Sequence, residues 1–210
     1  MLSQILKGER NITEDDKQVL KVVDRWVKRR LPEISTDRES EQSVSLASPN
    51  FPHLKIYGRI DLIEHLGNKN AKARLRQGLS LALASIRVTD FKTGSVRKKG
   101  DIEKLDEEGR MSGYLRQLAM YSYLLEQNPK WQAKVSESRL EFLEAKNSKE
   151  TFYDRVITKE ETDLLEKDIT DYNQLVKSGE WTDRECHYNS YGKHTECEYC
   201  RRAEIYKIAI

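Results

Sequence analysis

The sequence of 210 residues has little cysteine, little proline and no long apolar run. No stretch approaches the roughly 18 consecutive apolar residues that a membrane-spanning helix needs. Residues 1–30 carry charges throughout, and no secretory signal peptide is recognisable there. The three cysteines all lie within residues 186–200, an odd and clustered set that does not fit a secreted disulfide scaffold. We therefore expect an intracellular, cytoplasmic protein that does not bind membranes.

The sequence also lacks a dominant charge. The 37 Lys and Arg residues nearly balance the 35 Asp and Glu residues, which leaves a formal net charge of +2. Bulk charge therefore points to no class of partner, and any attraction to nucleic acid has to come from local clusters. The apolar residues fall in periodic blocks, with no internal repeat or low-complexity segment, so wholesale disorder is excluded.

The periodicity predicts a helix, three strands, a second helix, a β-hairpin and a third helix. Thr13 is a suitable N-cap for the first helix, and Thr158 with Glu161 forms a capping box for the last. We expect an α/β (α+β) fold, a mixed sheet flanked by helices, with a charged surface loop over residues 93–110. The expected helices are 13–31, 112–127 and 158–176, and the expected strands are 41–46, 54–65, 79–91, 137–145 and 151–157.

The chain divides by composition into three parts. An N-terminal helix and linker (residues 1–40) precede a core (41–178), and a tail rich in Cys and Tyr (179–210) follows it. We expect the tail to pack on the core.

Two acidic residues interrupt the apolar strands, and a lysine lies close to the second. Asp61 lies inside the strand of residues 54–65, and Asp90 ends the strand of residues 79–91. A carboxylate in an apolar strand is costly unless it is paired or holds a metal. Lys92 follows Asp90 at the spacing that puts both on one face. If the two strands are neighbours, the three side chains converge.

Such a cluster suits phosphodiester hydrolysis. Two carboxylates can bind Mg²⁺ and leave positions for water and a substrate phosphate, and the backbone carbonyl of Phe91 could complete the set. The Lys92 ammonium can orient the water or neutralise developing charge. Each acid taken alone could equally be an ordinary strand-end residue paired with Arg59 or Lys92.

The motifs around these residues resemble the PD-(D/E)XK nuclease superfamily, and more narrowly its RecB-type branch. That branch comprises the nuclease domains of helicase–nucleases and CRISPR-associated exonucleases. Its first motif, G-x-x-D, matches Gly58 and Asp61, and its second, D-x-K-[TS]-G, runs from Asp90 to Gly94. Its third motif, Q-x-x-x-Y, matches Gln117 and Tyr121 on the second expected helix. The resemblance covers about residues 40–145 and, more loosely, the tail.

The resemblance implies a restriction-endonuclease-like fold and a Mg²⁺- or Mn²⁺-dependent deoxyribonuclease. It assigns metal binding to Asp61 and Asp90, and gives Gln117 and Tyr121 a role in positioning the site and the DNA strand. Relatives act mainly on single-stranded ends and serve in DNA repair and recombination. The implied partners are therefore DNA, as single strands or duplex ends, and a helicase domain or subunit.

Two basic clusters flank the expected site and could line a phosphate groove. They are Arg74 and Arg76 before the second active-site strand, and Arg97, Lys98 and Lys99 after it. For each residue taken alone, a solvated, charged loop is the favoured interpretation.

The chain departs from the family upstream of the first strand. RecB-type relatives carry a His or Glu on an upstream helix as a further metal ligand, but here the first histidine is His53. Glu14 and Asp24 lie on the upstream helix, and the helical pattern places Asp24 beside the apolar stripe, facing water. We therefore expect the chain to lack an upstream part. The alternative is a weakly active or inactive module of the same fold that binds DNA or docks on a protein.

The tail departs as well. Relatives bind a [4Fe–4S] cluster through cysteines that include a C-x2-C, which here is Cys197 and Cys200, but Tyr206 stands where a later cysteine would fall. Cys186, His194 and the C-x2-C pair could instead hold Zn²⁺. A tail without metal, a zinc site and an iron–sulfur cluster remain three open interpretations, the cluster the least favoured because four thiolates are not available.

Overall fold

The computed structural model describes residues 13–47, 51, 54–66, 85–131, 134–146 and 151–179, and the backbone of 189–190 and 193–194. It divides into two compact units, Met1–Asp168 and Ile169–Ile210. The first unit holds the sheet, and the boundary falls within the last helix. The elements, in chain order, are α2 (Glu14–Arg30), η1 (Leu31–Glu33), β1 (Arg38–Ala47), β2 (Lys55–His65), β3 (Ser85–Lys92), α4 (Lys99–Glu103), α5 (Gly113–Glu126), β4 (Lys134–Phe142), β5 (Phe152–Arg155), α6 (Lys159–Ser178), β6 (Asn189–Ser190) and β7 (Lys193–His194).

The first five strands form one mixed sheet in the order β1-β2-β3-β4-β5. Only β3 and β4 run parallel, and the other neighbours are antiparallel. A parallel pair needs a long crossover, and α5 lies within that connection. The expected mixed sheet with flanking helices is confirmed, and so is the hairpin that β4 and β5 form.

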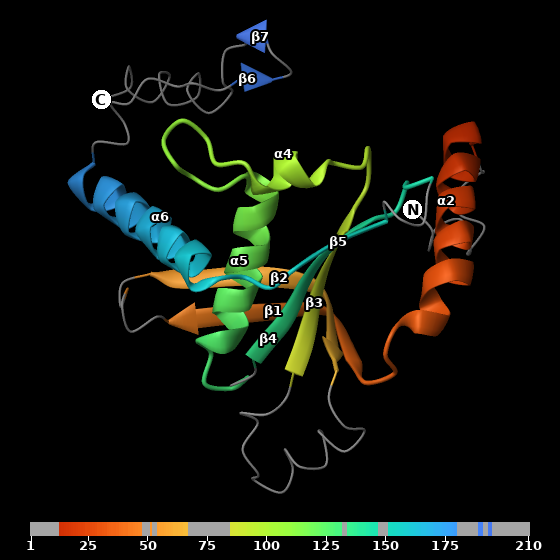
Figure 1. Ribbon diagram of the computed structural model, residues 1–210, viewed down its shortest axis with the longest axis horizontal. Coiled ribbons are helices and arrows are strands. Elements are labelled where there is room, and N and C mark those ends of the chain that lie inside the picture. Colours follow the sequence, from red (N-terminus) through yellow and green to blue (C-terminus); the bar gives the residue numbers. More distant parts are fainter. Residues whose placement is uncertain are drawn as a thin grey trace, which may run out of the picture. The chain divides into compact units, whose positions relative to one another are not determined.

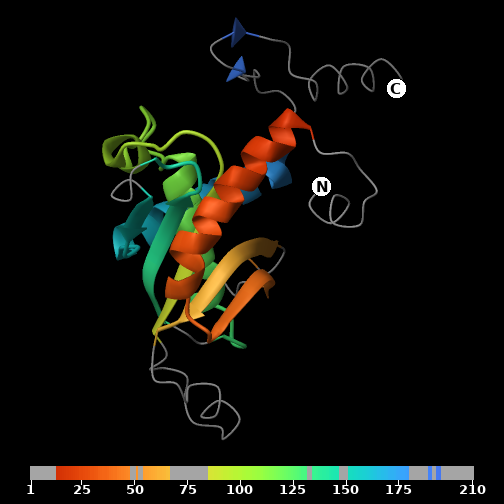
Figure 2. The ribbon, with the colours of Figure 1, turned by 90° about the vertical axis from the view of Figure 1, so that its right-hand side faces the viewer.

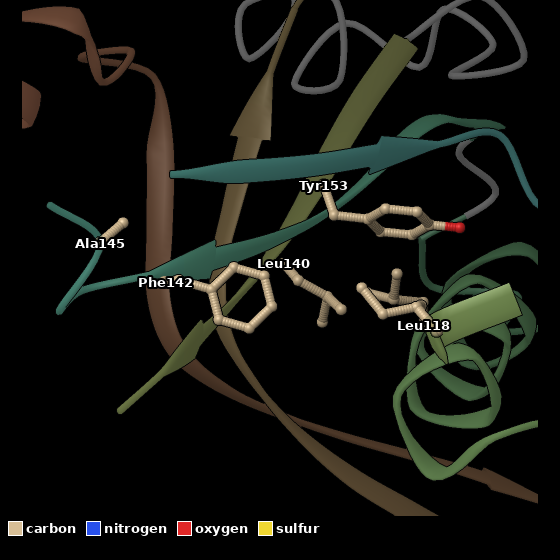
Figure 3. Packing of buried hydrophobic residues seen from close by; sticks show 6 residues of the cluster. Leu118, Leu140, Phe142, Ala145 and Tyr153 are labelled. Carbon is tan, nitrogen blue, oxygen red and sulfur yellow. The ribbon is translucent and has the colours of Figure 1, made fainter. Parts of the chain in front are cut away.

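Helix α5 packs its apolar side on one face of the sheet. Leu118 of α5 belongs to a buried cluster with Leu140 and Phe142 of β4 and Tyr153 of β5 (Figure 3). Each such leucine contributes about 1.5–3 kcal/mol through burial. The cluster fixes α5 against the strand next to β3, which carries Asp90 and Lys92.

Helix α2 lies on the opposite side of β3 and β4 from α5 (Figures 1 and 2). Thr13 is its N-cap, as the sequence predicts, and also forms a capping box with Asp16. Its deepest anchor is ionic: Arg30 and Glu141 of β4 are almost completely buried, with Arg30 Nε 3.1 Å from the carboxylate. A buried pair of this kind favours one position of α2 on the sheet. In any other position either partner would be a buried charge without its counter-charge, which is costly.

The outer part of β1 and β2 forms a two-stranded ribbon. β3 pairs only with Leu62–His65 of β2, whereas β1 pairs with β2 along nearly its whole length. The ribbon runs across the direction of β3 and β4, and α5 crosses it (Figure 1). Its inner side chains, Val44, Leu46, Ile56 and Ile60, are buried.

The prediction of a charged surface loop over residues 93–110 is partly wrong. It contains the short helix α4, whose Ile102 is completely buried in the cluster under α5. One apolar side chain in a charged stretch gives no periodic signal, so the sequence could not reveal this anchor. Strand β1 is longer than the expected 41–46. Within the described residues, no helix has the length and apolar character to cross a membrane.

Candidate active site

Asp61 and Asp90 lie where β2 and β3 separate. The last paired residues are Leu62 and Thr89, so the next residue on each strand is one of the two acids. The backbone N–H of Phe91 donates to Asp61 Oδ2 at 2.8 Å. The separated strands thus bring the two carboxylates near each other, as the sequence predicts, and the charge of Asp90 raises the pKa of Asp61.

Two residues of α5 hold the Asp90 carboxylate. Gln117 Nε2 donates to Asp90 Oδ1 at 2.7 Å, and the Tyr121 hydroxyl donates to the same oxygen at 3.1 Å. The Gln117 amide also donates to the Tyr121 oxygen at 2.8 Å. The four-residue spacing of these two side chains stacks them on one helix face. The third sequence motif therefore reaches the second acid directly.

Lys92 completes the cluster. Its Nζ donates to Gln117 Oε1 at 2.6 Å and lies 2.7 Å from Asp90 Oδ2. The ammonium also lies over the Tyr114 ring, 5.2 Å from its centroid, a cation–π contact that sequence reasoning missed. Tyr114 stands one turn before Gln117, and this helical spacing is the signal that could have found it. Lys92 remains partly exposed and so can meet a substrate.

Burial and neighbouring charge set the protonation of the site. Burial, opposed by the hydrogen bond from the Phe91 N–H, raises the pKa of Asp61, and the charges of Asp90 and Glu41 raise it further while Lys92 lowers it. Burial and the Asp90 charge raise the pKa of Tyr121 far above its usual range. Tyr121 therefore stays a neutral hydrogen-bond donor to Asp90.

The structure explains why glycine stands at position 58 in the first motif and at position 94 in the second. A Cβ on Gly58 would lie 2.6 Å from Leu124 Cδ1, so any larger residue here requires the buried Leu124 side chain or the strand to shift. Gly94 has φ +97°, a conformation that other residues rarely adopt. Its N–H donates to Glu144 Oε1 at 2.9 Å, which fixes the turn directly after Lys92.

Helix α2 supports the site from behind. Trp26 meets the Phe91 ring edge to face and donates from Nε1 to Glu141 Oε1 at 2.6 Å. The sequence placed Trp26 only in an apolar stripe. Nothing in the periodicity of α2 indicates which strand residue it contacts, so this support was missed. Asp24 is exposed, as expected, and it pairs with Lys28.

The donor set fits a hard divalent cation. Asp61 and Asp90 are close enough for the charge of one to raise the pKa of the other, and a cation would relieve this repulsion. Among the described residues, no three His, Cys, Asp or Glu side chains gather as a metal cage. Mg²⁺ commonly takes one or two carboxylates and fills its remaining positions with water and phosphate. The pair therefore suits Mg²⁺ or Mn²⁺ held together with substrate.

The remaining predicted residues divide into two groups. Arg97, Lys98 and Lys99 are exposed on the segment that leads into α4, and Lys99 lies 3.8 Å from Glu103. The others lie outside the described residues: Arg74, Arg76, Cys186, Cys197 and Cys200. For His194 only the backbone, in β7, is described. DNA binding by the basic residues and metal binding by the tail stay predictions.

Comparison with known proteins gives a family and a structural neighbour. The family model described as "PD-(D/E)XK nuclease superfamily" matches residues 3–205. A crystal structure from Eubacterium rectale, described as "Putative exonuclease", is similar with a TM-score of 0.50 and 13% sequence identity. The match covers 92% of this chain and 62% of the other, so the chain spans less than two thirds of that neighbour. Curated proteins gave no match. These findings, with the mixed sheet, confirm the restriction-endonuclease-like fold.

Proposed function

Because the chain belongs to the PD-(D/E)XK nuclease superfamily, we propose that it hydrolyses DNA phosphodiester bonds at Asp61, Asp90 and Lys92. The observation that carries this proposal is the meeting of two strand-borne carboxylates and one lysine where β2 and β3 separate. Asp61 and Asp90 are proposed to hold Mg²⁺ or Mn²⁺, with the Phe91 carbonyl as a further oxygen ligand. The bound metal would supply an activated water and stabilise charge on the phosphate.

Each residue of the cluster has a distinct task. Lys92 orients the attacking water or compensates the charge that develops on the phosphate oxygens. Gln117 fixes Lys92 and Asp90 at once, because its amide oxygen accepts from the first and its amide nitrogen donates to the second. Tyr121 donates to the same Asp90 oxygen as Gln117 does. The geometry keeps lysine and carboxylates ordered before substrate arrives, which lowers the cost of forming the transition state.

We further propose a single-strand exonuclease of the RecB type that acts inside the cell beside a helicase in repair or recombination. The sequence motifs support the branch, and the description of the structural neighbour agrees with exonuclease action. Arg97, Lys98 and Lys99 would contribute to DNA affinity. Arg74, Arg76 and a metal in the tail, zinc or an iron–sulfur cluster, remain part of the proposal.

The test is cleavage of end-labelled single-stranded DNA with Mg²⁺, Mn²⁺ or EDTA. We expect metal-dependent cleavage that Asp90→Asn reduces by about a hundredfold or more. Asp24→Asn is the matched control, since Asp24 is an exposed acid on α2. Circular single-stranded DNA separates the modes: an exonuclease leaves it intact. Salt-sensitive binding with no cleavage by the wild type would favour the DNA-binding alternative, and a helicase that cosediments without DNA binding would favour the docking one.

A further inference from the structure

The outer side of the β1–β2 ribbon exposes an aromatic and a cationic side chain on one strand face. Tyr57 is 60% exposed and the Arg59 side chain 62% exposed. Their neighbours on β2, Ile56 and Ile60, are buried on the inner side. A tyrosine this exposed buries little apolar surface, so the fold gains little from it.

This outer face is continuous with the catalytic cluster. Asp61 follows Tyr57 and Arg59 at the same two-residue spacing, and Lys55 begins the row at the other end. At about 3.4 Å per residue, the row from Lys55 to Asp61 spans about 20 Å, the length of a few nucleotides. β2 has no pairing with β3 along this stretch, so the edge of the ribbon that leads to the proposed metal ligand is not occupied by β3.

The Tyr57 ring is held in place. Its hydroxyl and Ser43 Oγ on β1 lie 2.9 Å apart in a hydrogen bond. Ser43 is paired with Arg59, so the ring leans along the ribbon toward the arginine. Fixing the hydroxyl end of an exposed ring orders it without covering its faces. An ordered, exposed ring is what base stacking requires.

Arg59 has only a weak competitor for a phosphate. Its Nη2 lies 2.5 Å from Glu41 Oε2, and both side chains are largely exposed. Ion pairs of this kind contribute little free energy, so a phosphate that offers two acceptor oxygens can displace the carboxylate.

Among the described residues, Glu41 is the non-glycine residue with positive φ, at +55°. Its backbone bends there, between the pairs Ser40–Leu62 and Gln42–Ile60, opposite Asp61.

We propose that this face binds the single strand adjacent to the reacting phosphate, with a base stacked on Tyr57 and a phosphate on Arg59. Lys55 adds a cation farther along the strand. Along the row, Lys55 and Arg59 offer positive charge to the phosphates of a nucleic-acid strand, and Tyr57 between them offers a ring to a base. The inference rests on the proposed nuclease function and assigns it a substrate subsite.

The experiment measures binding of a fluorescein-labelled oligothymidylate in EDTA by anisotropy, and kcat and KM for its cleavage in Mg²⁺. Tyr57→Leu should weaken binding about fivefold or more and raise KM. Tyr57→Phe should weaken binding less, because the stacking ring persists while the hydrogen bond to Ser43 that orders it is lost. Arg59→Gln should lower the slope of log affinity against log salt by about 0.7, the value of one lost phosphate on a single strand. Glu41→Gln should tighten binding, since it removes the competing carboxylate.

Matched controls are Tyr172→Leu, which removes an equally exposed tyrosine, and Arg38→Gln at the far end of β1. Neither should change affinity or KM. If the wild type cleaves the oligonucleotide and the Tyr57 and Arg59 variants match it in affinity, salt slope and KM, the subsite is overturned and the nuclease function stands. If the wild type neither binds nor cleaves DNA, the proposed function fails and the subsite with it.

Discussion

Trp26 of α2 and Phe91 of β3 meet edge to face, with ring centroids 5.4 Å apart. Phe91 lies between Asp90 and Lys92, and its N–H donates to Asp61. The contact therefore connects the N-terminal helix to the backbone segment that carries the site. The same indole donates to the buried Glu141, which also pairs with Arg30.

Removing this indole should affect both stability and the site. Trp26→Ala is expected to lower the free energy of unfolding by about 2 kcal/mol, less than for a fully buried tryptophan, because the side chain is half-buried. It should also raise the Mg²⁺ concentration needed for half-maximal cleavage, since Phe91 then orients Asp61 less well. Urea unfolding and metal titration measure the two effects. Val27→Ala, the next and more exposed residue, is the control; an equal change in that variant would contradict the coupling.

Lys92→Ala should abolish cleavage without unfolding the chain. The side chain is partly exposed and contributes charge to the site rather than to the core. We expect a loss of about a hundredfold to a thousandfold in kcat, with an unchanged circular dichroism spectrum. Lys28→Ala, which removes an exposed lysine of α2 that pairs with Asp24, should leave activity intact. Retained cleavage in Lys92→Ala would rule out the proposed role.

The Asp61 carboxylate is expected to lower the stability of the fold at neutral pH, although the proposed activity needs it. Its pKa is raised, chiefly by burial, so between its unfolded and folded pKa values the native state binds more protons than the unfolded state. Stability contributed by this group is therefore lost as pH rises through the folded pKa. Asp61→Asn should be inactive but more stable than wild type at about pH 7, with the gain shrinking toward about pH 4. Denaturant unfolding across pH tests this. A variant less stable than wild type at neutral pH would contradict it.

The sequence predicted the site better than its surroundings, for a physical reason. Asp61, Asp90 and Lys92 can be recognised from the sequence because a charge inside an apolar strand is costly. Gln117 and Tyr121 can be recognised because their four-residue spacing places them on one helix face. These signals are local. The contacts of Trp26 with Phe91 and Glu141 join residues far apart in the chain, so no local pattern encodes them.

The faces of β2 show the same limit. Alternation predicts that Tyr57, Arg59, Asp61 and Ile63 share one side, and the first two are indeed exposed. Ile63, however, is completely buried. At Ile63 the strand already pairs with β3, within the sheet that helices flank, whereas at Tyr57 it belongs to the two-stranded ribbon. Where a strand changes from ribbon to sheet depends on its partners, and the strand's own residues do not reveal it.

Gly58→Ala should destabilise the fold by placing a methyl group where β2 touches α5. The new Cβ would lie 2.6 Å from Leu124 Cδ1, in a position next to Tyr121, so either the leucine or the strand has to move. Overpacking of this kind costs about 1–3 kcal/mol. Gly100→Ala in α4 is the control, since its Cβ would meet open space, and it should be neutral or stabilising by about 0.5–1 kcal/mol.

Adding Leu124→Ala to Gly58→Ala makes room for the methyl group, so a double-mutant cycle in urea should show a favourable coupling energy. Purely additive effects would show that the close approach of Gly58 to Leu124 is not what requires glycine.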